Sequence, residues 1–509
     1  MSNANVMNRW LVVVGAILIQ LCLGAIYAWS VFTPALKETD KAELVKMISP
    51  TVLGLGEQEA EAWSTHRAAI ADADAAADPA RKKAAIEAFD SFAQATAPTV
   101  SDGAWSKHYF GFTAAQTQWV FGVGLAVFAV VMVLAGQMQA KIGPRPVTIM
   151  GGVLLGLGYV LAGLFGQTFT MQILCIGVLG GAGIGLAYVC PIKVGMAWFP
   201  DKKGMITGLA VAGFGFGALI WIKLAGSWGN LIANVGLLTT FWVYGAAFAV
   251  MVLIGSVWMV NPPEGWKPKG WQPPQAPAGG KPAAGATEMT PGQMLAKPQF
   301  YGLWLMFVFS GMAGLMTIGI IKLFGLDALQ KAGMDLAKAS AVAGTAWAVF
   351  GSIANGICRI VWGTLSDKLG RKVCLFLMCL FQGIIMLTFY WLGGSEWGLY
   401  IGAMIIGFNF GGNFSLFPTA TADFFGAKSV GLNYGWVFTA YGVGGIVGPI
   451  MAGYIRDTWK NFQAAFIVCG VACLVAAVIG LMLRAPKARQ VEAAPAPAPI
   501  PEPDVVNEG

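Results

Sequence analysis

Long apolar stretches separated by short polar loops run through most of the chain. Twelve of these stretches are long enough to cross a bilayer as a helix, which requires about 20 apolar residues. They cover residues 10–36, 113–135, 147–166, 171–195, 204–226, 239–260, 298–321, 340–363, 373–392, 397–418, 430–453 and 462–484. The first is too long for the core of a cleaved signal peptide, so we expect it to remain as a helix. The pattern predicts an all-α membrane protein with twelve transmembrane helices.

Three polar segments divide this pattern. Residues 37–112 form an insertion between the first two apolar stretches, and its charged, Ala-rich part at 57–92 is typical of an amphipathic helix. Residues 261–297 are rich in Pro, Gly and Ala and indicate a flexible linker, whereas 485–509 indicate a disordered tail. We therefore predict a six-helix half at 1–260 that carries the insertion, the linker, a second six-helix half at 298–484, and the tail.

The two halves repeat one another at a constant separation of 227 residues. The matching pairs are Gly136 and Gly363, Gly143 and Gly370, Gly180 and Gly407, Gly185 and Gly412, Pro191 and Pro418, Gly208 and Gly435, Gly215 and Gly442, and Gly217 and Gly444. A register that holds without a gap over four helices is stronger evidence than any single glycine. It predicts two pseudo-symmetric halves related by an axis along the membrane normal.

Composition and charge placement narrow the protein class. Hydrophobic residues make up 57% of the chain and charged residues 11%, which is too few to coat a soluble globule. The net charge of +7 resides largely in short loops on one side of the predicted bundle, which argues against nucleic acid as a partner. The positive-inside rule makes that side cytoplasmic. We expect a multi-pass inner-membrane protein, monomeric in the bilayer, with both termini in the cytoplasm.

Chemistry-bearing residues are scarce within the apolar stretches. The eight cysteines form no CxxC pair, and both histidines lie in the insertion, so we predict neither a metal site nor another cofactor. The spans offer no nucleophile–base pair, which argues against an enzyme. A solute sensor built on a transporter scaffold remains an alternative, with the insertion as its docking module. A channel is disfavoured because a two-half repeat suits alternating access.

A charged motif follows the eighth apolar stretch. Its sequence, Gly363-Thr-Leu-Ser-Asp367-Lys-Leu-Gly370-Arg371-Lys372, resembles the loop motif of the major facilitator transporters. The earlier copy, from Gly136 through Gly143 to Arg145, has Ala140 where the motif has aspartate. The resemblance implies the major facilitator fold and a gating latch, in which the aspartate holds the inner ends of neighbouring helices. The alanine puts the latch of the N-terminal half in question.

Three further motifs narrow the resemblance. They are Tyr27-Ala-Trp29-Ser30-Val-Phe32, the stretch from Trp198 to Gly213, and Gly407-Phe-Asn409-Phe-Gly-Gly-Asn413. Together they are similar to the oxalate:formate antiporter family, and more distantly to the monocarboxylate transporters. The resemblance covers the chain except the insertion and the tail, and it implies transport of small carboxylates.

Arg359 is the first candidate for contact with a solute. It lies inside the eighth stretch, with Thr345, Ser352 and Asn355 on the same helical face. Intramembrane charges are costly and commonly functional, and a guanidinium can hold a carboxylate with two hydrogen bonds. The family resemblance also implies a substrate-binding arginine in this span. The alternative is a structural arginine that binds backbone carbonyls.

Other polar side chains in the spans are candidates for the wall of the same site. Each offers a hydroxyl, an amide or a ring, or an ammonium in the case of Lys322. Lys322 lies near the end of a span, where a lysine ordinarily extends to the membrane surface, and its alternative role is to attract anions from the outer side. Each of the others could equally hold helices together or pack against them. They are Gln20, Tyr27, Trp29, Lys322, Asn409, Asn413, Tyr434 and Tyr441.

The pattern of charges favours a singly charged solute. Oxalate carriers of the family have a lysine in the eleventh span, and the surrounding residues place Tyr441 there. A dianion held by Arg359 alone would keep an uncompensated charge. We expect a secondary active transporter of monocarboxylates such as formate, acetate, lactate or pyruvate. Anion exchange is favoured because no span core holds Asp or Glu for a proton relay; the alternatives are an oxalate:formate antiporter proper or a proton-coupled symporter.

Overall fold

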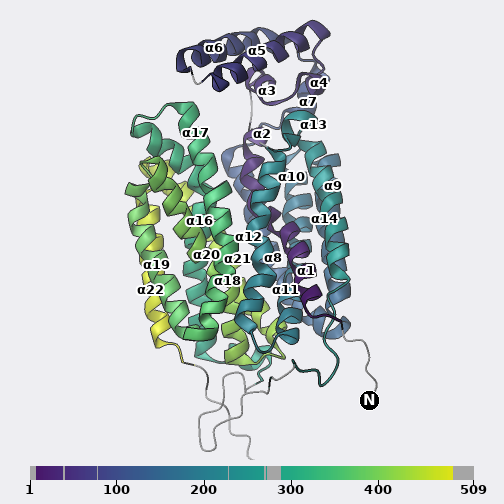
Figure 1. Ribbon diagram of the computed structural model, residues 1–509, viewed down its shortest axis with the longest axis vertical. Helices are drawn as coiled ribbons and strands as arrows, with labels where there is room; N and C mark the ends of the chain where they lie inside the picture. The colour runs from purple at the N-terminus through teal and green to yellow at the C-terminus, as the bar shows by residue number, and fades with distance from the viewer. Residues whose placement is uncertain are drawn as a thin grey trace, which may run out of the picture.

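The computed structural model describes residues 7–37, 40–76, 78–226, 228–268, 271, 288–484 and 486. Within these ranges it contains helices and no strand, and twelve helices are long and apolar enough to cross a membrane (Figure 1). The predicted fold class is therefore confirmed at the level of secondary structure. All of the predicted tail except residue 486, and most of the middle of the predicted linker, lie outside the described residues.

Each half supplies six spans. Those of the N-terminal half are α1 with η1 (Trp10–Leu23, Gly24–Val31), α8 (Ala114–Ile142), α9 (Pro144–Phe165), α10 with η3 and α11 (Phe169–Gln172, Ile173–Gly180, Gly181–Trp198), α12 (Lys203–Ala225) and α14 (Leu237–Ser256). Those of the C-terminal half are α16 (Pro298–Lys331), α17 with η4 and α18 (Leu336–Thr345, Ala346–Gly351, Ser352–Leu369), α19 (Arg371–Leu392), α20 (Glu396–Phe425), α21 (Val430–Trp459) and α22 (Gln463–Met482).

The bundle has two distinct ends. The insertion lies at one end, which we call the insertion side, as α3 (Lys41–Met47), α4 (Pro50–Leu53), α5 (Glu57–Ala75), α6 (Pro79–Thr96), η2 (Ala97–Thr99) and α7 (Asp102–His108). The short helix α2 (Thr33–Lys37) follows the first span and leads into it. The start of α1, the end of α14 and the start of α16 lie at the other end, which we call the linker side (Figure 1). Two short helices complete the fold, α13 (Leu231–Val235) and α15 (Pro291–Leu295). The assignment of the linker side to the cytoplasm stays a prediction.

Several helices extend beyond the apolar stretches that predict them. The stretch at 397–418 predicts the end of a span, but α20 continues to Phe425 through Pro418. Hydropathy marks the part of a helix that crosses hydrocarbon, whereas the helix itself ends where its backbone is capped. The single amphipathic helix expected at 57–92 is instead a pair, α5 and α6, because Asp78 caps a new helix that starts at Pro79.

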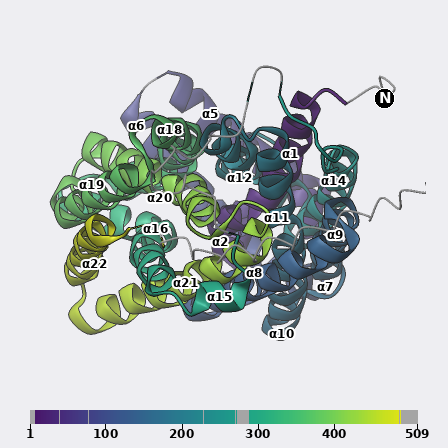
Figure 2. The same cartoon turned by 90° about the horizontal axis from the view of Figure 1, so that it is seen from below.

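Two seams join the halves, and glycines line both. The first runs between α12 and α18, where a methyl group added to Gly204 or Gly208 would overlap the main-chain oxygen of Gly363 or Arg359. The second runs between α8 and α21, where a methyl group on Gly136 would overlap the main-chain oxygen of Gly431. These pairs are related by the 227-residue repeat, so the same backbone approach occurs twice (Figure 2). Small residues allow such close helix packing in membranes.

We expect Gly208→Ala to destabilise the protein by about 1–3 kcal/mol or more, as overpacking does, because the atom that opposes the new methyl belongs to a backbone that cannot rotate away. The thermal midpoint of the purified protein measures this. Gly453→Ala on α21 is the matched control, since that position has open space and alanine favours a helix. Equal midpoints for the two variants would contradict this account of the seam.

The insertion attaches to the N-terminal half. The Ser49 amide donates to the Ala233 oxygen on α13 at 2.7 Å, and the Phe112 amide donates to the Leu36 oxygen at 2.9 Å. His108 packs on Gly236, which has a φ of 81° and leaves room for the imidazole ring. Burial of that ring, together with the neighbouring Lys107, lowers the pKa of His108 below its ordinary value.

Acid should loosen this attachment. A histidine whose pKa is lower in the folded state takes up a proton more readily in the unfolded state. Its contribution to stability is therefore complete above about pH 6.5 and declines as the pH falls toward the folded pKa. We expect proteolytic release of the insertion to accelerate below about pH 6.5 in the parent protein. His108→Gln should flatten this dependence, and His66→Gln, on α5 of the same insertion, should not. An unchanged pH profile in His108→Gln would contradict the prediction.

Candidate functional site

Arg359 lies at the seam between the halves, where the structure leaves none of its side chain exposed. Its Nε and Nη2 donate to Asn355 Oδ1 at 3.1 and 2.9 Å, one helical turn earlier on α18. Its Nη1 donates to the Val211 main-chain oxygen on α12 at 3.0 Å, so the guanidinium bridges the two halves. A guanidinium has five N–H groups. Beyond these contacts the guanidinium has one further N–H on each terminal nitrogen.

The positive charge of Arg359 is not balanced by an acid. Among the described residues that are buried, Arg359 is the one charged side chain, and no Asp or Glu accompanies it. An unpaired ion in a low-dielectric interior costs several kcal/mol. Stacked rings offset part of this cost, because its Cζ lies 4.2 Å from the ring centre of Phe414 and 5.4 Å from that of Phe214. The site is electrostatically prepared for an anion.

Aromatic rings from both halves enclose the guanidinium. Phe214 packs against Tyr27 and Tyr188 in the N-terminal half, with ring centres 5.0 and 5.4 Å apart. Phe414 packs against Tyr441 in the C-terminal half at 5.5 Å. Such walls exclude water, which strengthens any charge interaction inside them. Tyr188, Phe214 and Phe414 are absent from the sequence-based candidates, because nothing in the sequence distinguishes them from the packing aromatics of the spans.

Tyrosine hydroxyls gather around the same point. Tyr27 and Tyr441, from opposite halves, share a hydrogen bond of 2.8 Å. The hydroxyls of Tyr188 and Tyr434 are buried and have no hydrogen-bond partner. The Nδ2 of Asn355 is equally without one. Unsatisfied buried donors are costly, so their convergence near Arg359 indicates a place where a ligand supplies the missing acceptors.

The remaining sequence-based candidates lie in other surroundings. Both polar ends of the Asn413 amide are occupied, by Ser310 at 2.7 Å and by the Phe410 oxygen at 2.9 Å. Trp29 donates to the Thr117 oxygen and Gln20 to the Tyr188 oxygen, which joins helices within the N-terminal half. Asn409 is buried, and Lys322 is exposed on α16. The structure thus unites Arg359, Asn355, Tyr27, Tyr434 and Tyr441 and leaves the others outside that cluster.

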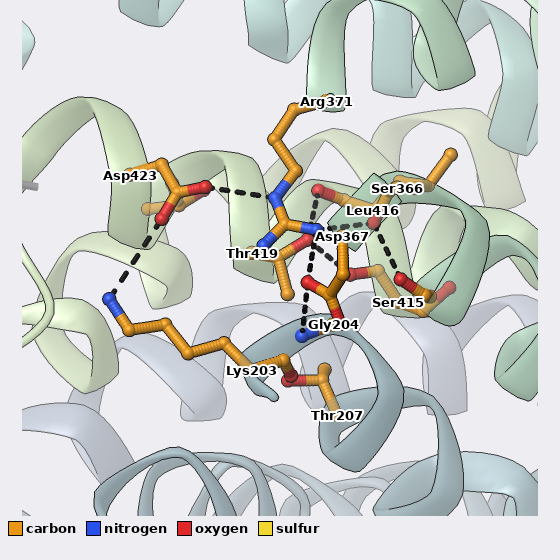
Figure 3. A network of polar contacts seen from close by, with 12 residues as sticks. Lys203, Gly204, Thr207, Ser366, Asp367, Arg371, Ser415, Leu416, Thr419 and Asp423 are labelled. Carbon is orange, nitrogen blue, oxygen red and sulfur yellow. Dashed lines mark hydrogen bonds and ion pairs between the residues drawn. The ribbon is translucent and has the colours of Figure 1, made fainter. Parts of the chain in front are cut away.

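A second polar cluster closes the linker side (Figure 3). Asp367 binds Arg371 Nη1 at 2.8 Å and accepts from the amides of Gly204 and Met205 at 3.1 and 2.9 Å. It therefore caps α12, a helix of the other half, where a carboxylate also meets the positive end of the helix dipole. Asp423 accepts from Arg371 Nε at 2.8 Å and lies 3.9 Å from Lys203 Nζ.

The two copies of the charged loop motif share the same turn between helices. Gly370 and Gly143 have φ values of 87° and 85°, so both copies turn between helices through a backbone conformation that favours glycine. Lys372 and Arg145 are exposed. Asp423 is absent from the sequence-based candidates because it lies beyond the apolar stretch that ends at 418. An aspartate five residues after Pro418, at the predicted inner end of a span, could have indicated a partner for the cations of the loop motif.

Polar contacts between the halves occur only in part of the bundle. Between described residues they are the Tyr27–Tyr441 and Arg359–Val211 bonds at the cluster and the Asp367 and Lys203 contacts on the linker side. The insertion side has no such bond between the halves in the same residues. This structure is locked at the linker side, with the candidate site just beyond the lock.

Comparison with known proteins agrees with this architecture. The sequence model of the Major Facilitator Superfamily matches residues 86–431 and 352–505. The apicoplast pyruvate carrier 1 of Toxoplasma gondii is 26% identical over 483 residues, which cover 85% of this chain and 81% of that protein. The oxalate:formate antiporter of Oxalobacter formigenes is 25% identical over 372 residues, which cover 73% of this chain and 82% of the antiporter.

A solved structure shows the same fold. The human organic anion transporter MFSD10 (TETRAN) superimposes with a TM-score of 0.57 at 13% sequence identity, over 93% of this chain and 100% of that one. The match to the family model covers most of the chain and confirms the resemblance that the loop motif predicts. This multi-pass membrane protein is therefore a transporter, not an enzyme, and belongs to the major facilitator superfamily.

Proposed function

We propose that this transporter carries small monocarboxylates by alternating access and exchanges one anion for another. The observation that carries the proposal is the buried guanidinium of Arg359, which has no acid partner among the described residues. A carboxylate fits it because two oxygens can accept from two adjacent nitrogens. Relatives named as a pyruvate carrier and an oxalate:formate antiporter support this solute class.

The proposal favours one negative charge on the solute. Tyr441 occupies the position where oxalate carriers of the family have a lysine, and its hydroxyl is engaged with Tyr27. A monoanion neutralises Arg359, whereas the second charge of oxalate would meet tyrosine hydroxyls and aromatic rings. Desolvating that second charge is costly. Formate, acetate, lactate and pyruvate are thus favoured over oxalate.

The proposal favours exchange over proton symport. A proton relay through the spans commonly uses an intramembrane carboxylate. The described buried residues include none, and Asn355 occupies the turn before Arg359. Without a bound anion, the charge of Arg359 stays unbalanced in the centre of the carrier during the conformational change. A bound anion neutralises this charge and lowers the energy of that change, so the loaded carrier should reorient more readily than the empty one.

Counterflow in proteoliposomes tests the proposal. Vesicles loaded with formate should take up labelled formate, acetate or pyruvate rapidly, and vesicles without an internal anion should not. Oxalate should compete weakly. Uphill uptake driven by an imposed pH gradient without internal anion would overturn exchange, and stronger competition by oxalate than by every monocarboxylate would overturn the choice of a monoanion.

A further inference from the structure

The last part of the linker, from Glu288 onward, is docked on the C-terminal half at the turn of residues 426–429 between α20 and α21. Gly426 has a φ of 106°, and a methyl group added to it would overlap the Glu288 carboxylate and lie 2.9 Å from the Glu288 Cα. Glycine therefore permits this close approach of two backbones. Asn433, buried on α21, donates to the Met289 oxygen at 3.0 Å. A segment that the sequence predicts as flexible is thus fixed where it meets this turn.

Glu288 and Met289 satisfy backbone groups on both sides of the turn. The Glu288 carboxylate accepts from the amides of Lys428 and Ser429 at 3.1 and 3.3 Å. The Met289 amide donates to the oxygen of Phe425, the last residue of α20, at 2.9 Å. The last carbonyls of a helix have no partner within the helix, and they leave its final turn prone to fraying unless another group binds them. The linker therefore holds the last turn of α20 in place.

That last turn carries a charged residue of the gate. The gate on the linker side consists of Lys203, Asp367, Arg371 and Asp423 (Figure 3). Asp423, two residues before Phe425, accepts from Arg371 Nε at 2.8 Å and lies 3.9 Å from Lys203 Nζ. Because Lys203 belongs to the N-terminal half, Asp423 helps to hold the two halves together. Fraying of the last turn of α20 would carry Asp423 away from both cations.

The equivalent turn of the N-terminal half carries no such residue. The position that matches Phe425 in the 227-residue repeat is Trp198, the last residue of α11. Its Nε1 donates to the oxygen of Val260, where the linker begins, at 2.8 Å. The position that matches Asp423 is Met196, which offers no charge to a gate. The two ends of the linker thus contact repeat-related helix ends, and the end at α20 alone adjoins a gate residue.

We propose that Glu288 is a positioning residue of the linker-side gate. By binding the turn before α21, it holds the last turn of α20 and keeps Asp423 within reach of Arg371 and Lys203. The linker then does more than connect the two halves, because its docked end helps to keep the linker side closed. Displacing Glu288 from the turn should favour the open state. The inference rests on the alternating access of the proposed function, in which the linker side opens and closes in each cycle.

Labelling of a buried cysteine measures the state of the gate. A cysteine in place of Thr207, which is buried beside the gate residues, should react with a soluble maleimide when the linker side opens. We expect Glu288→Ala to raise the labelling rate by about 5-fold, and Glu288→Gln, which keeps one acceptor oxygen, to raise it less. Glu264→Ala, which removes an exposed acid from the first part of the same linker, is the matched control and should leave the rate unchanged.

A second variant separates positioning of Asp423 from a general loosening of the fold. Asp423→Asn alone should label faster than the parent, and adding Glu288→Ala should raise the rate no further, because two changes that act through one residue are not additive. The inference is overturned if the two changes multiply, if Glu264→Ala matches Glu288→Ala, or if Glu288→Ala lowers the thermal midpoint but labels at the parent rate. The proposed function fails on different evidence, the absence of anion counterflow in the parent protein.

Discussion

Arg359→Met is expected to lose carboxylate binding by at least about 100-fold while the ligand-free protein unfolds at no lower temperature than the parent. A charge-assisted hydrogen bond contributes roughly 1.5–3 kcal/mol, so losing two explains the fall in affinity. Replacing an unbalanced buried charge by an apolar side chain of similar size is commonly neutral or stabilising. Acetate binding and thermal unfolding of the same preparation measure both effects.

The variant separates a binding arginine from a structural one. If Arg359 serves to tie α18 to α12, removing its bonds to Asn355 and Val211 should lower the unfolding temperature and spare the affinity of the remaining folded protein. Arg359→Lys should bind weakly, since an ammonium keeps the charge but lacks the planar fork. Lys223→Met, near the end of α12, is the control for loss of a cation elsewhere in a span.

Asp367→Asn is expected to open the linker side. The change keeps the size of the side chain but removes the ion pair with Arg371 and weakens the caps on Gly204 and Met205. A loss of about 1–3 kcal/mol shifts the equilibrium between the closed and open states by roughly 5- to 150-fold. A cysteine introduced at Thr207, which is buried beside the gate, should react faster with a soluble maleimide in the variant.

Asp201→Asn is the matched control for this gate. Asp201 lies on the same side and pairs with Arg9 at 3.1 Å, but both residues belong to the N-terminal half. Its loss removes an ion pair without releasing one half from the other. Equal labelling rates at position 207 in both variants would show that Asp367 does not hold the gate.

The sequence predicted the parts of this molecule that repeat along the chain. The apolar stretches located the twelve spans that the described residues contain, and the 227-residue register predicted two related halves. The close contacts at Gly136 and Gly363 were not predicted, although the register relates them. Arg359 was identifiable because a charge within an apolar stretch is exceptional. The division into domains and the roles of the individual site residues stay predictions, and the counterflow and binding experiments address the latter.

The site and gate residues that the sequence did not predict depend on contacts between distant segments. Tyr188 and Phe214 become wall residues only because α11 and α12 face Phe414 from the other half. Asp423 joins the gate because α20 extends past the apolar stretch to reach Arg371.

The helical insertion offers a handle for watching the transporter work. Its described hydrogen bonds reach only the N-terminal half, through Ser49 and Phe112. An antibody fragment raised against α5 and α6 should therefore move as one body with the N-terminal half and mark its orientation. It should not restrict movement of that half relative to the C-terminal half. If the proposed alternating access holds, imaging such a complex with and without formate should show a rotation of one half against the other.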